Sequence, residues 1–164
     1  SGKSTVTRVL RDETGCNVLD ADKYGHAAYK KGTACYDKLV SYFGIDIVNE
    51  CDGEINRRAL GSIVFSDPTK MRALEQIVWP EIRELISDDL LKLKSEYSEN
   101  QKPQIVVLEA AIMIEAGWQD LIDVLWVVSV DKPHKPQLKA QRILHKGHRK
   151  LPLYLDGRYK NEEG

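Results

Sequence analysis

Two apolar runs constrain the fold of this 164-residue chain more than any other feature. They are Ile105–Leu108 and Leu125–Val130, and polar residues scarcely interrupt them. A run that is apolar at successive positions predicts a strand covered on both faces. The shorter run Asn17–Leu19 predicts a further strand, and helical patterns separate the three. Strands that alternate with helices indicate an α/β domain with a parallel sheet.

The helical segments are marked by apolar spacing and by residues that start or stop helices. Gly15 is expected to end the first helix, and several short helices are expected between Tyr24 and Phe65. Asp67 is predicted to cap a helix that begins at Pro68, and Pro80 is expected to break that helix into two. The remaining helices are expected at residues 4–11, 112–116 and 136–146.

Composition excludes several classes of protein. Lys and Arg number 24 against 25 Asp and Glu, so the net charge of −1 argues against a polycationic nucleic-acid binder. The longest apolar stretch, Ile105–Ala116, is interrupted by Glu109 and is too short to cross a bilayer. The three cysteines have no CxxC spacing, which disfavours a disulfide framework and a cysteine zinc site and suits a reducing compartment.

The chain opens on Ser1-Gly2-Lys3-Ser4-Thr5, which contains the second half of the phosphate-loop pattern GxxxxGK[ST]. In such a loop, backbone N–H groups and a helix N-terminus bind phosphates, the lysine neutralises phosphate oxygens, and the serine hydroxyl ligates Mg²⁺. The first glycine of the pattern and its strand would precede Ser1. The alternative is an ordinary helix start, but the following helix and a strand that ends in Asp favour the phosphate loop.

Three carboxylates follow predicted strands and are therefore expected at the edge of the sheet where ligands bind. Asp22 is the candidate base that accepts a proton from an attacking hydroxyl, and Asp20 is a candidate for the Mg²⁺ or substrate side. One of the pair is equally suited to cap the next helix. Glu109 suits a metal-bound water, as a Walker B acid does, or the entry of a helix.

Basic pairs are the remaining candidates for phosphate contacts. Arg57 and Arg58 suit either phosphates or a solvated helix face, and the sequence alone favours the solvated face. Arg142 and Lys146 stand one helical turn apart, which suits either a clamp on a transferring phosphate or an exposed basic helix end. The four histidines have no metal-ligand spacing and are treated as ordinary.

Several segments together resemble one family, the dephospho-coenzyme A kinases, over Ser1 to about Gly147. Their order and spacing are more specific than any one of them, and the Trp-Pro pair and the Glu-Ala-Ala segment look most like eukaryotic members, including the kinase domain of bifunctional coenzyme A synthase. The segments are SGKST, VLDAD, FGIDIV, GEINRRALGSIVF, LEQIVWPEI and EAAIMIEAGW.

The resemblance implies a P-loop kinase-like parallel sheet flanked by helices, with a helical substrate-side insertion and a lid. It implies ATP, Mg²⁺ and the acceptor dephospho-coenzyme A, whose ribose 3′-hydroxyl takes the γ-phosphoryl group in the last step of coenzyme A synthesis. It also implies roles for individual residues: Asp22 as base, Arg57 on the substrate-side helices, Arg142 at the start of the lid helix, and Lys3, Ser4 and Thr5 in the nucleotide loop. The residues themselves suggest Ser1 and Gly2 in the same loop, Asp20 on the substrate side, and Ser4 and Glu109 toward the metal.

The chain also departs from this family. Lys146 stands where members carry a second lid arginine, and residues 148–164 do not align. We interpret residues 1–164 as one kinase domain that lacks its first strand. Loss of three or four buried apolar side chains, at about 1.5–3 kcal/mol each, is large against a domain stability of about 5–15 kcal/mol. The 164 residues alone are therefore expected to be unstable or inactive, and the parent protein active.

Two other functions compete with this interpretation: another P-loop kinase that phosphorylates nucleosides or nucleotides, and a nucleotide-binding module without catalysis. We expect no nucleic-acid partner and no membrane-spanning segment. A cytoplasmic location is expected, while a mitochondrial one and a fusion to an upstream coenzyme A pathway enzyme are left open.

Overall fold

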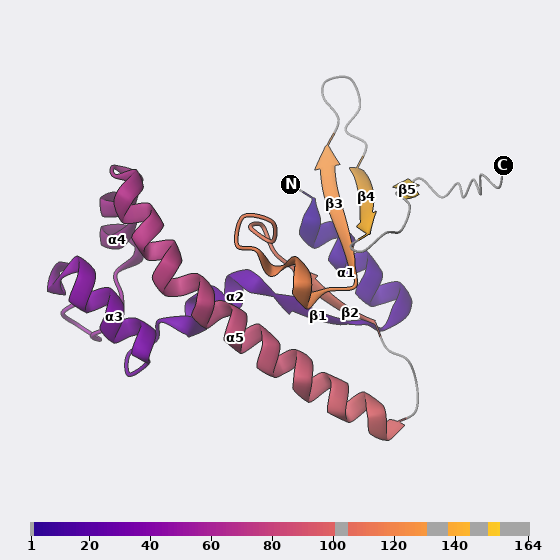
Figure 1. Cartoon of the computed structure of the whole chain (residues 1–164), viewed down its shortest axis with the longest axis horizontal. Coiled ribbons are helices and arrows are strands. Elements are labelled where there is room, and N and C mark those ends of the chain that lie inside the picture. Colours follow the sequence, from indigo (N-terminus) through magenta and orange to yellow (C-terminus); the bar gives the residue numbers. More distant parts are fainter. Residues whose placement is uncertain (1, 101–104, 131–137, 145–150, 155–164) are drawn as a thin grey trace. The chain divides into compact units, whose positions relative to one another are not determined.

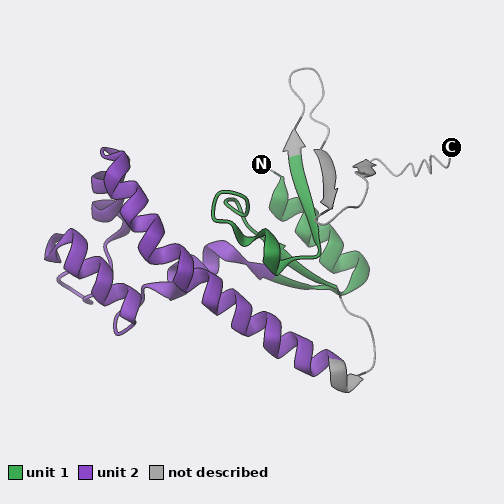
Figure 2. Cartoon of the chain, viewed as in Figure 1, with its two compact units in different colours: residues 1–18, 105–164 green, residues 19–104 purple. Residues whose placement is uncertain are grey.

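The computed structural model describes the backbone of residues 2–100, 105–130, 138–144 and 151–154, and the side chains of residues 2–97 and 105–128. Within these ranges the chain forms helices and short strands, with a run of helices between the first two strands and three consecutive strands as the last elements described (Figure 1). It divides into two compact units, of which one comprises residues 1–18 and 105–164 and the other residues 19–104 (Figure 2).

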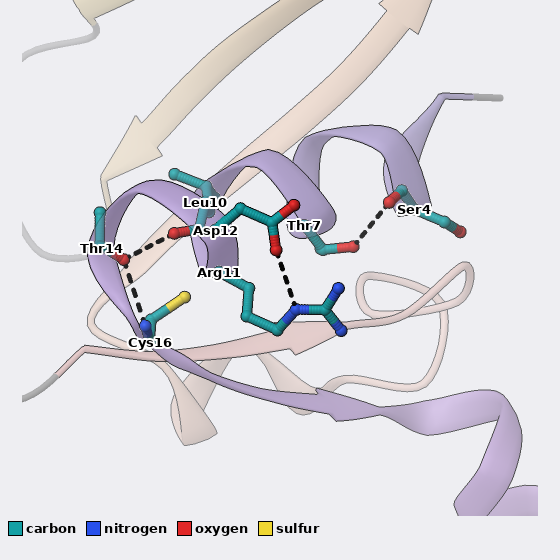
Figure 3. Close-up of polar contacts among 7 residues, drawn as sticks. All are labelled: Ser4, Thr7, Leu10, Arg11, Asp12, Thr14 and Cys16. Carbon is teal, nitrogen blue, oxygen red and sulfur yellow. Dashed lines mark hydrogen bonds and ion pairs between the residues drawn. The ribbon is translucent and has the colours of Figure 1, made fainter.

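The first unit contains helix α1 (Lys3–Thr14), which lies between Gly2 and Gly15 and ends at Gly15 as the sequence predicts. Gly15 takes a left-handed backbone with φ of 68°, and its N–H donates to the carbonyl of Arg11 at 2.8 Å. Only glycine adopts that conformation at little cost, so the helix stops there. Thr14 reinforces this end, because its hydroxyl donates to the Leu10 carbonyl and accepts from the Cys16 N–H (Figure 3).

Strands β1 (Asn17–Asp20) and β2 (Val106–Glu109) pair in a two-stranded sheet, the parallel sheet that the sequence predicts. Their side chains are mostly half-exposed, and Ile105 is 62% exposed, so full coverage of both faces is not observed for β2. The expected helix at 112–116 is a turn instead, in which the Ala116 N–H donates to Ile112 and the Trp118 N–H to Met113. A 3₁₀ helix, η2 (Trp118–Leu121), follows it, and the Trp118 side chain is buried.

The second sheet corrects the prediction of a helix at 136–146, and with it the placement of Arg142 at the start of a lid helix. Strand β3 (Val124–Val130) pairs antiparallel with β4 (Leu138–Leu144), which pairs antiparallel with β5 (Leu151–Tyr154). Arg142 therefore lies within a strand, opposite Trp126 on one side and Leu151 on the other. The composition of this segment suits a helix, but hydrogen bonds to strands on both sides override a weak local preference.

The second unit is helical and matches the short helices expected between Tyr24 and Phe65. Its core is formed by fully buried side chains that come from three different elements: Cys35, Leu39, Ile47 and Ile86. The whole unit comprises α2 (Ala21–Ala28), α3 (Ala34–Phe43), η1 (Ile45–Ile47), α4 (Arg57–Phe65) and α5 (Pro68–Asn100). The fully buried side chains come from α3, η1 and α5.

Helix α5 corrects the prediction that Pro80 divides it, because it continues through this residue. A proline inside a helix removes one backbone hydrogen bond and costs about 3 kcal/mol. Val78, Ile82 and Ile86 are all buried, at about 1.5–3 kcal/mol per side chain, and this burial offsets that cost. The start of α5 is as predicted, since the Asp67 carboxylate accepts from the Thr69 N–H at 2.8 Å.

The three cysteines lie in the described part of the chain, and all are free. Burial raises the pKa of the Cys35 thiol to about 11, so this cysteine is a core residue and no reactive thiolate. Among the described residues, no helix is both long and apolar enough to cross a membrane.

Candidate functional site

The N-terminus of α1 has the features of an anion-binding helix end. Gly2 takes a left-handed backbone with φ of 84°, which strongly favours glycine at this position. No side chain caps the helix, and its first turn carries no acidic residue. The first N–H groups of a helix have no partner within the helix, and they carry a partial positive charge. This end of α1 is therefore suited to phosphate oxygens, as the opening motif predicts.

Glu109, the last residue of β2, is hydrogen-bonded through both carboxylate oxygens to hydroxyl groups of α1. Ser4 Oγ donates to Glu109 Oε1 at 2.7 Å, and Thr7 Oγ1 donates to Glu109 Oε2 at 2.7 Å. The structure thus brings together Ser4 and Glu109, the two residues predicted for a metal. Two short hydrogen bonds to one carboxylate fix its position and orientation.

Thr7 is a residue of this site that the sequence analysis missed. It stands three positions after Ser4, so the two side chains share one face of α1. The Thr7 hydroxyl also lies 3.3 Å from the Ser4 carbonyl (Figure 3). The helical spacing of two hydroxyl residues was the available signal, but it gains meaning only from the distant partner Glu109.

The predicted pair of aspartates sits at the junction of β1 and α2. Asp20 Oδ1 accepts from the Asp22 N–H at 3.1 Å, so Asp20 is the N-cap of α2. Asp22 lies in the first turn of that helix, where a negative charge is favoured, and its side chain is exposed to solvent. The interpretation of one aspartate as a cap therefore applies to Asp20, and the exposed Asp22 carboxylate remains the candidate base.

Arg57 is the first residue of α4, and its guanidinium approaches His26 of α2 and Tyr29, the C-cap residue of that helix. Arg57 Nη1 lies 2.6 Å from Nε2 of His26. Burial raises the pKa of the Tyr29 hydroxyl, while the positive charge of Arg57 and a hydrogen bond from it oppose this rise. His26 and Tyr29 were both missed: the sequence gives no ligand spacing for a histidine, and nothing in it pairs residues 26 and 57.

The remaining predicted residues are placed as follows. Lys3 and Thr5 lie in the first turns of α1 with Ser4, and the exposed Arg58 follows Arg57 in α4. Ser1, Lys146 and the side chain of Arg142 lie outside the described residues. The candidate residues thus form two sets. One set belongs to residues 1–18 and 105–164, and the other, with Asp22 and Arg57, to residues 19–104.

The side chains near Glu109 offer few ligands of their own to a divalent cation. No cluster of three or more His, Cys, Asp or Glu side chains suited to a metal is found in the described part of the chain. A serine hydroxyl and one carboxylate do meet, however, at Ser4 and Glu109. Magnesium prefers oxygen ligands and is commonly held by one or two carboxylates, waters and substrate phosphates. The side chains present therefore fit Mg²⁺ bound together with a nucleotide better than a protein-only metal site.

An α/β chain whose first helix opens on half of a phosphate-loop pattern, with no side chain capping it, is typical of the nucleotide-binding class, and comparison with known proteins makes the family definite. A family model described as "Dephospho-CoA kinase" (CoaE) matches residues 1–148. The chain belongs to the dephospho-CoA kinase family. The eukaryotic likeness inferred from the sequence stays a prediction, because the relatives described next are bacterial.

Two similar relatives are both named dephospho-CoA kinase. The protein from Symbiobacterium thermophilum is 41% identical over 147 residues, which cover 90% of this chain and 57% of the relative. The protein from Geobacter sulfurreducens is 41% identical over 132 residues, which cover 80% of this chain and 64% of the relative. The chain therefore spans about three fifths of the length of these curated relatives.

Solved structures agree with this assignment. The dephospho-CoA kinase of Campylobacter jejuni superposes with a TM-score of 0.57 at 26% identity, covering 73% of this chain and 57% of the other. A crystal structure of a Thermus thermophilus protein gives a TM-score of 0.57 at 35% identity, covering 74% of this chain and 56% of the other. The described helices and strands thus adopt the α/β fold that the sequence predicts.

Proposed function

We propose that the protein containing this chain is a dephospho-coenzyme A kinase, which transfers the γ-phosphoryl group of ATP to the ribose 3′-hydroxyl of dephospho-coenzyme A. The observation that carries the proposal is the family match over residues 1–148. The contact of Ser4 with Glu109 beside the helix start of α1 supports it, because phosphoryl transfer depends on positioned phosphates and a metal.

Binding of the nucleotide is proposed on α1. Backbone N–H groups at residues 1–5 bind the phosphates of ATP, and the Lys3 ammonium neutralises their outer oxygens. Ser4 and Glu109 would hold Mg²⁺, the serine directly and the carboxylate through water. When bound, the ion neutralises charge on the phosphates. Thr7 keeps the Glu109 carboxylate in place through its 2.7 Å hydrogen bond.

Binding of the acceptor is proposed on residues 19–104. The exposed Asp22 carboxylate accepts the proton of the attacking 3′-hydroxyl, and Asp20 holds the helix turn that carries Asp22. Arg57 binds an anionic group of the acceptor through its planar fork of N–H donors. Arg142 remains a proposed phosphate contact, although it lies in strand β4 and not in a lid helix.

The organisation of the whole protein belongs to the same proposal. Residues 1–164 are proposed to form a single kinase domain, in which residues 19–104 are the helical substrate-side insertion. A cytoplasmic location is proposed. The sequence on either side of these residues would show whether another coenzyme A pathway enzyme is fused to this domain.

The test is a coupled assay of ADP release with MgATP on this chain and on the protein extended at both ends. Three conditions are compared: dephospho-coenzyme A, a panel of nucleosides and nucleotides, and no acceptor. Turnover with dephospho-coenzyme A alone supports the proposal. If the extended protein turns over only with nucleosides or nucleotides, it is a different kinase, and if it binds ATP without turnover, it is a non-catalytic module; either result refutes the proposal.

A further inference from the structure

Neighbouring residues orient both the backbone around Arg57 and its side chain, all within residues 19–104. At its backbone, the Asn56 side chain caps α4 by accepting from the N–H groups of Arg58 and Ala59, each at 3.1 Å. At its head group, the guanidinium contacts His26 Nε2 at 2.6 Å and lies close enough to the Tyr29 hydroxyl to oppose the rise in its pKa. Tyr29 is the C-cap residue of α2 and follows His26 by three positions.

The chemistry of the pair fixes the state of His26. A guanidinium carries only donors, so Arg57 Nη1 donates and His26 Nε2 accepts. An imidazole nitrogen that accepts has no hydrogen, so the His26 ring is neutral and its proton sits on Nδ1. His26 therefore takes a defined tautomer when it holds Arg57, and this tautomer can be measured without any substrate.

The contact leaves Arg57 able to bind a ligand. The guanidinium has more N–H donors than one imidazole nitrogen and one phenol oxygen can accept. Both His26 and Arg57 are exposed, so the head group is accessible to solvent. An arginine loses much rotamer freedom when it binds an anion, and a side chain that is already oriented loses less.

We propose that His26 is a positioning residue, which orients Arg57 to bind a phosphate group of the acceptor substrate. This inference rests on the proposed function, because it takes Arg57 as the arginine of the acceptor side. A purely structural tether between α2 and α4 is the competing explanation. Loss of a tether lowers stability, whereas loss of a positioning contact selectively weakens binding of the acceptor.

The kinetic test uses the full-length protein with four variants: His26→Ala, His26→Gln, Arg57→Ala and the His26→Ala/Arg57→Ala double variant. His26→Ala is expected to raise the KM for dephospho-coenzyme A roughly five- to tenfold, the effect of losing one hydrogen bond to a charged group at an exposed site. Its kcat and its KM for ATP are expected to stay within about twofold of wild type. His26→Gln recovers most of the acceptor affinity, because its amide oxygen also accepts from Arg57.

Two further readouts separate positioning from structure. In the Arg57→Ala background, His26→Ala is expected to change the acceptor KM no further, as required of residues that act through one contact. Nitrogen-15 spectra of the imidazole are expected to show the Nδ1–H tautomer of His26 in wild type and its loss in Arg57→Ala.

The outcomes that overturn the proposal are distinct from failure of the proposed function. If wild type turns over and His26→Ala leaves the acceptor KM unchanged, or raises the KM of ATP equally, His26 does not position Arg57. If the His26 tautomer is the same in wild type and Arg57→Ala, the contact itself is refuted. Wild type without turnover refutes the proposed function and the substrate role of Arg57 with it, while the tautomer still decides the contact.

Discussion

Replacing Thr7 by valine gives a direct test of the site at the start of α1. The change keeps the β-branched shape of the side chain and removes the hydroxyl that donates to Glu109 Oε2 at 2.7 Å. Threonine and valine have similar helix propensities, so α1 is expected to remain intact. What is lost is one of the two hydrogen bonds that fix the Glu109 carboxylate.

The size of the effect follows from the setting of this hydrogen bond. A hydrogen bond to a charged group contributes about 1.5–3 kcal/mol. Thr7 and Glu109 are only half-buried, so water competes for the carboxylate and we expect about 1–1.5 kcal/mol. Because about 1.4 kcal/mol corresponds to a factor of ten in rate, Thr7→Val should lower kcat/KM for MgATP about five- to tenfold.

The assay measures turnover at a series of Mg²⁺ concentrations for wild type, Thr7→Val and the matched control Thr7→Ser. The serine variant keeps the hydroxyl and is expected to stay within about twofold of wild type. In a Glu109→Gln background, Thr7→Val should have a smaller effect, because the charged acceptor has been removed. A Thr7→Val enzyme with wild-type kinetics would refute the positioning of Glu109 by Thr7. Equal losses in the valine and serine variants would assign the effect to packing.

Three further results are expected. Asp22→Asn should lower kcat by roughly 10²–10⁴-fold, the usual share of acid–base catalysis, and an unchanged kcat in steady-state assays would exclude Asp22 as the base. Lys3→Ala should abolish productive ATP use, measured as ADP release at saturating MgATP, and near-normal release would contradict a phosphate loop. Tyr24→Phe should lower the free energy of unfolding by about 1 kcal/mol, because the Tyr24 hydroxyl donates to Asp89 at 2.6 Å in a partly exposed setting. That hydrogen bond, with a smaller contribution from Lys92, lowers the pKa of Asp89. The stability that the hydrogen bond contributes is therefore present above the unfolded pKa of about 3.9 and is lost as pH falls through the folded pKa. Urea titrations of wild type and Tyr24→Phe at pH 7 and pH 3 measure this loss, and an equal difference in stability at the two pH values would contradict it.

Features set by short-range chemistry could be predicted from the sequence. Gly15 ends α1 and Asp67 begins α5 because each acts on backbone groups within a few residues. The strand at Asn17–Asp20 and the following cap were likewise visible, since a short apolar run led directly into acidic residues.

Features set by long-range contacts could not be predicted in this way. Pro80 is a helix breaker by local rules, yet α5 continues because neighbouring apolar side chains are buried. The segment Leu138–Leu144 has the composition of a helix, and only its pairing with Val124–Val130 and Leu151–Tyr154 makes it a strand. Local preference is a few tenths of a kcal/mol for ordinary residues and about 3 kcal/mol for proline, so strand pairing and the burial of several apolar side chains decide such cases.

The candidate site residues show the same difference between short-range and long-range features. Ser4 and Glu109 could be paired in advance, because a helix start and a strand end of this fold meet at one edge of the sheet. His26 could not be assigned, since its meaning depends on Arg57, 31 residues away on another helix. Thr7 could not be assigned either, because its partner Glu109 is 102 residues away.

Structural hydrogen bonds and proposed functional roles are compatible at two places in the structure. Asp20 caps α2 through Oδ1, and the N–H that it accepts from belongs to Asp22, so the cap fixes the turn that presents the candidate base. Ser4 donates its hydroxyl proton to Glu109, which leaves the lone pairs of its oxygen for a cation. A structural role for a residue therefore does not weaken its functional assignment here, because each structural hydrogen bond orients a group that the proposed chemistry requires.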